Sequence, residues 1–104
     1  MDINDLGWER NAPEYETGDY WFNGKFFVTR EVKETLSELE ITLIYADIKN
    51  LVGQWGGQDY LHVYLQKEKN LKLFFIDQVT RESLQQKEQP SEHNYCTLLF
   101  AHEY

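Results

Sequence analysis

The residues that could do chemistry in this sequence are three histidines, one cysteine and a set of carboxylates. A zinc site would need ligands in close pairs, such as cysteines two residues apart or histidines at helical spacing. His62, His93, His102 and Cys96 show no such spacing. The chain also lacks the glycine-rich loops that hold phosphates and the local signatures of catalytic nucleophiles. We therefore expect no metal, no cofactor and no enzymatic activity.

One enzymatic alternative stays open, in which His62 or His102 acts as a base with Asp77 or Glu103 as its carboxylate partner. Asp77 closes an apolar run shortly before Arg81, and this arrangement favours an Asp77–Arg81 pair that fixes a turn over one that takes part in catalysis. Cys96 lies in the apolar run "NYCTLLF", which indicates a small buried side chain and not a nucleophile.

The charge of the chain is strongly negative and uneven. It carries 18 acids and 10 bases, a net charge of −8, and most of the excess lies in residues 1–40. Binding to phosphate backbones depends on Lys and Arg, so direct nucleic-acid binding is disfavoured. A protein partner with a basic surface is favoured, and simple solubility is the alternative explanation.

The sequence contains no apolar span long enough for a membrane, and its single cysteine excludes an internal disulfide. We expect a cytoplasmic protein, without a membrane partner, that is a monomer or a small homo-oligomer. Its 104 residues fit one domain with a core rich in aromatic side chains.

The first part of the chain shows neither helical nor strand periodicity. We predict an irregular, acidic, aromatic-rich arm over residues 1–18 and a single domain over residues 19–104. The turn dipeptide Asn23-Gly24 separates two β-prone runs, which predicts a hairpin of Asp19–Phe22 with Lys25–Thr29.

Two helices are predicted next. Thr29 can cap a short helix over Arg30–Leu36. "SELE" at Ser37–Glu40 is a capping box, and the apolar spacing that follows predicts a main helix over Glu38–Val52 ended by Gly53.

Beyond Gly57 the period changes to two. Leu61–Leu65 and Leu71–Val79 predict an antiparallel hairpin, Thr80–Asn94 a polar loop, and Tyr95–Phe100 a last strand. The expected fold class is α+β, with an antiparallel sheet of about four to five strands packed on one main helix and a short helix.

Trp55-Gly56-Gly57 joins the main helix to this hairpin. The glycines supply the bend, and Trp55 either caps the open end of the core or forms an exposed aromatic patch with Trp21 and Tyr20.

Four segments, "NGKFFVTREVKETL", "GQWGGQD", "LKLFFIDQVTRES" and "CTLLFAHEY", resemble a family of small uncharacterised proteins found on plasmids, phages and bacterial genomes. The matching positions are Gly24, Thr29, Leu36, Trp55, Gly56, Leu98, Leu99, Glu103 and Tyr104. The resemblance implies an accessory protein of mobile elements. An acidic protein of that kind is similar to anti-CRISPR and anti-restriction inhibitors, which present carboxylates to basic surfaces.

The leading hypothesis is a non-enzymatic acidic protein that inhibits or regulates a larger, basic, nucleic-acid-handling protein. Acids of the N-terminal third would speed association and aromatic rings would anchor the complex. The predicted partner-binding residues are Asp2, Asp5, Trp8, Glu9, Glu14, Glu16, Asp19, Tyr20, Trp21 and Trp55. Two alternatives are an immunity protein that neutralises a nuclease toxin and a subunit that associates through the edge of its sheet.

Overall fold

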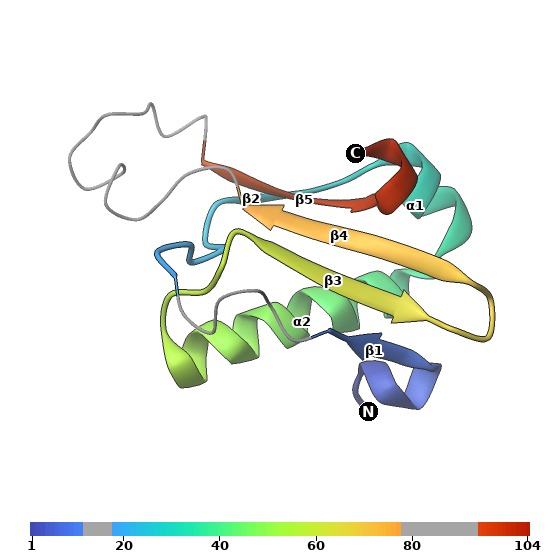
Figure 1. Cartoon of the computed structure of the whole chain (residues 1–104), viewed down its shortest axis with the longest axis horizontal. Helices are drawn as coiled ribbons and strands as arrows, with labels where there is room; N and C mark the ends of the chain where they lie inside the picture. Colours follow the sequence, from blue (N-terminus) through green and yellow to red (C-terminus); the bar gives the residue numbers. More distant parts are fainter. Residues whose placement is uncertain (12–17, 78–93) are drawn as a thin grey trace.

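The computed structural model describes residues 1–11, 18–77 and 94–104. The described chain forms a five-stranded sheet with one main helix packed on it and a short helix beside it (Figure 1). The elements are η1 (Ile3–Leu6), β1 (Trp8–Arg10), β2 (Lys25–Val28), α1 (Arg30–Thr35), α2 (Glu38–Trp55), β3 (Leu61–Gln66), β4 (Leu71–Asp77), β5 (Tyr95–Phe100) and η3 (Ala101–Glu103). The α+β class is therefore confirmed.

The sheet has the strand order β1-β3-β4-β5-β2. β3 and β4 form the antiparallel hairpin that the period-two pattern predicts, with Val63 opposite Phe74, and β5 continues the sheet antiparallel to β4. β2 runs parallel to β5, so the sheet is mixed and the prediction of an entirely antiparallel sheet is wrong in this pair.

The predicted hairpin of Asp19–Phe22 with Lys25–Thr29 does not form. The backbone amide of Phe22 donates to the Asp77 carboxylate at 2.9 Å, and the Phe22 ring is fully buried. The chain then bends at Gly24 and enters β2, where the Lys25 amide donates to the Asn94 carbonyl. Long-range contacts therefore override the local turn signal of Asn23-Gly24.

Both predicted helices form with their predicted caps. The Thr29 side chain accepts the Val32 amide at the start of α1, and Ser37 and Glu40 form the capping box of α2. The end of α2 differs from the prediction, because the helix continues through Gly53 to Trp55. Gly53 faces open space, whereas Gly56 adopts φ +81°, a backbone geometry that ends the helix.

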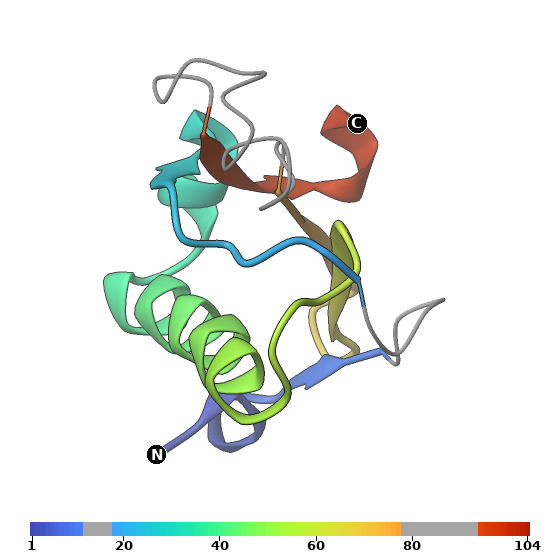
Figure 2. The same ribbon diagram turned by 90° about the vertical axis from the view of Figure 1, so that its left-hand side faces the viewer.

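The core lies between α2 and the concave side of the sheet (Figure 2). Ile44 and Ile48 of α2 are buried there, and the C terminus lies on the other side of the sheet. Ile3 and Trp8 belong to the same core, and β1 pairs antiparallel with β3. The first ten residues are thus part of the domain, which corrects the prediction of an irregular arm there. The predicted loop over Thr80–Asn94 lies, except for Asn94, outside the described residues.

In the part of the chain that the structure describes, no helix is both long enough and apolar enough to cross a membrane.

Candidate interaction site

The predicted partner-binding residues do not form one surface. Asp2, Asp5, Trp8 and Glu9 lie on η1 and β1, beside the N-terminal half of α2 (Figure 1). The segment with Asp19, Tyr20 and Trp21 lies instead near the C-terminal end of α2, which carries Trp55. Glu14 and Glu16 lie outside the described residues.

Trp8 is a core residue, so the prediction that it anchors a partner is corrected. Its side chain has a relative exposure of 0%, and its indole Nε1 donates to Glu40 Oε2 at 2.7 Å. A side chain without exposed surface has no area to offer a partner.

The acids of the first turn have local structural roles. The Asp5 carboxylate accepts the Asp2 amide at 2.8 Å, and the Asp2 carboxylate accepts the Asn4 amide at 2.9 Å, which together cap η1. Glu9 lies 3.4 Å from the ammonium of Lys67 in an exposed pair. Such exposed pairs contribute little to stability, so the Glu9 carboxylate is only weakly held by Lys67.

Trp55 has the opposite environment to Trp8. It is the last residue of α2, and 71% of its surface is exposed. The interpretation of Trp55 as a cap on the core is therefore wrong, its exposure agrees with the second interpretation, and its role as an anchor stays a prediction. A single exposed apolar side chain is common on protein surfaces, so the neighbours of Trp55 decide whether it belongs to a larger aromatic surface.

The glycines that follow Trp55 permit a close backbone approach. The Tyr20 and Gln58 backbones exchange two hydrogen bonds, and the Gly18 amide donates to the Gly57 carbonyl at 3.3 Å. A Cβ atom on Gly57 would overlap the Gly18 carbonyl oxygen and would crowd the Trp21 indole. These contacts bring Tyr20 and Trp21 to the turn that follows Trp55.

The end of α2 beside Trp55 has negative electrostatic character. The last turn of a helix leaves carbonyl groups without intrahelical donors, and the helix dipole adds partial negative charge there. The last turn of α2 contains no basic residue. Tyr60, which lies 6.0 Å from Tyr20 between ring centroids, adds a further ring that is 40% exposed. The site is thus an aromatic surface beside a helix C terminus whose last turn has no basic residue.

His62, one of the two histidines of the enzymatic alternative, is buried in the core. Its relative exposure is 0%, and neither ring nitrogen makes a hydrogen bond of ordinary geometry with another described residue. Burial lowers the pKa of His62 and the charge of Arg10 lowers it further, while Asp59 and Asp47 oppose this shift. The ring is therefore neutral and has no exposed surface through which a substrate would reach it.

A polar network lies next to His62, between α2 and the first strands of the sheet. Asp47 accepts from Arg10 Nε at 2.7 Å and from the Tyr64 hydroxyl at 2.8 Å. Burial and the neighbouring Asp47 carboxylate hold the pKa of Tyr64 well above its usual range. These groups satisfy one another inside the domain, so the network serves the fold.

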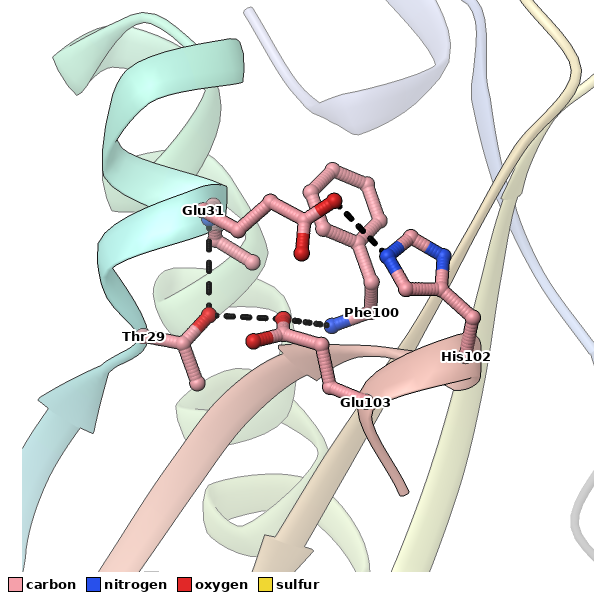
Figure 3. Close-up of polar contacts among 6 residues, drawn as sticks. Thr29, Glu31, Phe100, His102 and Glu103 are labelled. Carbon is pink, nitrogen blue, oxygen red and sulfur yellow. Dashed lines mark hydrogen bonds and ion pairs between the residues drawn. The ribbon is translucent and has the colours of Figure 1, made fainter.

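Side chains of η3, at the C-terminal end of the chain, contact the start of α1 (Figure 3). The Glu103 carboxylate accepts the Thr29 hydroxyl and the Phe100 amide, each at 2.8 Å. His102 lies 2.7 Å from the Glu31 carboxylate and stacks on the Phe100 ring. Because His102 and Glu103 have separate partners, they do not form the base and carboxylate pair of the enzymatic alternative.

The remaining candidates are also held inside the fold. Asp77 accepts the Phe22 amide, and Arg81, its expected partner, lies outside the described residues. Cys96 is buried as predicted, and burial together with the Asp77 charge raises its pKa to about 12. Among the described residues, no three His, Cys, Asp or Glu side chains come together as metal ligands would.

Two exposed rings were not singled out from the sequence. Phe27 of β2 lies edge-on against Tyr95, and Tyr60 lies beside Tyr20. Both occupy strand-like runs, where alternation alone does not say which face is open.

Comparisons of the chain with protein-family models, curated proteins and solved structures gave no match.

Proposed function

We propose that this protein is a non-enzymatic, acidic, cytoplasmic binding protein that inhibits or regulates a larger protein with a basic, nucleic-acid-handling surface. Trp55 at the end of α2 is the anchor of that interaction, and Tyr20 and Trp21 flank it. The N-terminal carboxylates Asp2, Asp5 and Glu9 act at a distance by attracting the basic partner.

The observation that carries the proposal is the 71% exposure of Trp55 beside a helix C terminus that has no basic residue in its last turn. An arginine or lysine of a partner can lie over the indole as a cation–π pair. The same side chain can donate to the terminal carbonyl groups of the helix. One basic residue therefore satisfies both features.

The charge of the chain agrees with such a partner. A net charge of −8 on 104 residues favours encounter with a basic surface and disfavours contact with phosphates. Exposed carboxylates act on the association rate, whereas a central ring acts on the lifetime of the complex. We assign these two roles to the N-terminal acids and to Trp55 respectively.

The experiment is affinity capture from host lysate with three immobilised proteins: the wild type, Trp55→Ala and the neighbouring control Gln54→Ala. We expect the wild type and the control to retain the same basic, nucleic-acid-handling protein, and Trp55→Ala to lose it. Raising the salt from about 50 mM to about 500 mM should weaken retention, because salt screens exposed charges.

Capture that is insensitive to both Trp55→Ala and salt would contradict the proposal. The identity of the captured protein also separates the two related roles. A nuclease toxin would make this an immunity protein, and a host defence complex would make it an inhibitor of that complex.

A further inference from the structure

The edge of the sheet at β2 carries backbone groups that pair with no other residue in the described part of the chain. β2 is the last strand in the order β1-β3-β4-β5-β2, and within the described residues no strand lies on its outer side. The amides of Lys25 and Thr29 donate to carbonyl groups on the β5 side, from Asn94 and Leu98. Because strand backbone groups alternate in direction, the N–H and C=O groups of Phe26 and Val28 point to the open edge. An exposed edge of this kind is a template for another strand.

A groove opens beside the last residue of this edge. It has a volume of about 370 Å³ and is lined by Val28, Lys33, Leu36, Glu38, Ile41 and Thr42. Next to it, the rings of Phe26 and Tyr45 stack with centroids 4.4 Å apart, so α2 closes over the first half of β2 only. Ile41 lies one helical turn before Tyr45, and there the space between α2 and β2 stays open.

The groove has an apolar interior and a charged rim. Val28, Leu36 and Ile41 supply the apolar surface, and Lys33 and Glu38 carry opposite charges. Neither Lys33 nor Glu38 makes an ion pair with the other described residues. The groove can therefore take an apolar side chain that has an acid on one side of it and a base on the other.

We propose that β2 and this groove bind an extended peptide segment of another protein as an additional strand of the sheet. The peptide backbone pairs with Phe26 and Val28, one apolar side chain enters the groove, and flanking charges reach Lys33 and Glu38. Recognition of this kind takes affinity from main-chain hydrogen bonds and specificity from side-chain pockets. The surface is separate from Trp55, which lies at the opposite end of α2.

The probe is the peptide acetyl-Ser-Arg-Thr-Leu-Thr-Glu-Ser-amide, whose Arg, Leu and Glu project to one face of a strand. Versions with Val or Phe in place of Leu test the size of the side chain. One control peptide replaces Leu by Ser, and another carries N-methyl groups on alternate amides, which removes the donors needed for pairing. Binding is measured by fluorescence polarisation with a labelled peptide.

We expect at least one of the three apolar peptides to bind, and both control peptides to bind about tenfold more weakly or worse. Thr42→Trp, at an exposed groove position, should weaken binding by a similar factor because the indole fills the groove. Asn50→Trp, at an exposed position further along α2, should have no effect, and neither should Trp55→Ala. The last variant separates this proposal from the function proposed above.

Hydrogen exchange gives the second readout. Amides of Phe26 and Val28 should exchange rapidly in the free protein and become protected with peptide, whereas the Lys25 amide, already bonded to Asn94, should change little. Failure of all three peptides to bind at about 1 mM would overturn the proposal. So would binding that ignores Thr42→Trp, or a dimer of the free protein that Thr42→Trp abolishes, which would assign the edge to a second copy of the chain.

Discussion

Trp8 Nε1 and Glu40 Oε2 lie 2.7 Å apart, while Glu40 Oε1 accepts the Ser37 amide at 3.0 Å. One carboxylate therefore closes the capping box of α2 and fixes the first strand of the sheet against that helix. We expect Glu40→Ala to lower the free energy of unfolding by about 1–3 kcal/mol, because it leaves the buried indole donor of Trp8 without a partner. Urea unfolding followed by tryptophan fluorescence measures the change, with exposed Glu38→Ala as the control.

The same contact predicts how stability depends on acid. Burial raises the pKa of Glu40, but hydrogen bonds from Ser37 and Trp8 outweigh burial, so the pKa lies below the ordinary value of 4.5 for a glutamate. A lowered pKa in the folded state gives stability that is present above the unfolded value and is lost as the pH falls below it. Glu40→Gln should flatten this loss. If the free energy of unfolding of Glu40→Gln falls with pH just as that of the wild type does, Glu40 is not the cause of the loss at low pH.

His62 predicts a pH dependence in a higher range. Its pKa in the folded protein lies below the ordinary histidine value of 6.5 because of burial and the charge of Arg10, so the unfolded chain binds the proton more readily. Stability should therefore decrease as the pH falls below about 6.5. We expect His62→Leu to reduce this decrease and to be as stable as the wild type at pH 8 or more so, since it removes two unsatisfied polar atoms. The exposed His102→Gln is the control, and a decrease that survives in His62→Leu would contradict the assignment.

The network around Asp47 predicts a coupling between residues. Tyr64→Phe removes one hydrogen bond and should cost about 1 kcal/mol, whereas Asp47→Ala leaves both Tyr64 and Arg10 without a partner and should cost about 2–3 kcal/mol. The double variant should cost less than the sum of the two. A double-mutant cycle measured by urea unfolding checks this, and strictly additive losses would show that the network does not act as a unit.

Two glycines, one in the last turns of α2 and one in the turn that follows it, should respond in opposite directions to substitution by alanine. Gly53 is helical with open space around it, so Gly53→Ala should raise stability by about 0.5–1 kcal/mol. Gly57→Ala would place a Cβ atom on the Gly18 carbonyl oxygen and should destabilise the protein by at least about 1 kcal/mol. Thermal unfolding of the two variants side by side is sufficient. Equal changes in melting temperature for the two variants would show that a Cβ atom at Gly57 does not clash with the Gly18 carbonyl oxygen.

The elements that could be predicted from the sequence are those defined by local signals. The caps of α1 and α2 are formed by residues three positions apart, and the β3–β4 hairpin follows from period-two alternation across a short turn. The partner of β2 could not be predicted in this way. Its position depends on Asp77, which holds Phe22 from 55 positions away, and on β5.

The site was predicted only in part, for a related reason. Trp8 lies among acids and Trp55 follows an apolar helix, yet Trp8 is buried and Trp55 is exposed. Local hydrophobicity does not determine burial at the end of a helix or at a sheet edge. The tertiary partner decides it, and for Trp8 that partner is Glu40.

The strand order also has a consequence for synthesis on the ribosome. Lys25 of β2 contacts Cys96 of β5, 71 positions later. β1 likewise pairs with β3, a strand that is synthesised after it. Both outer strands come from the first third of the chain, while the strand that completes the centre is made last. A nascent chain can form α2 and the β3–β4 hairpin early, but β2 has no neighbour until Tyr95–Phe100 has emerged. We expect protease protection of β2 in stalled nascent chains to appear abruptly, only when this last strand is free of the ribosome.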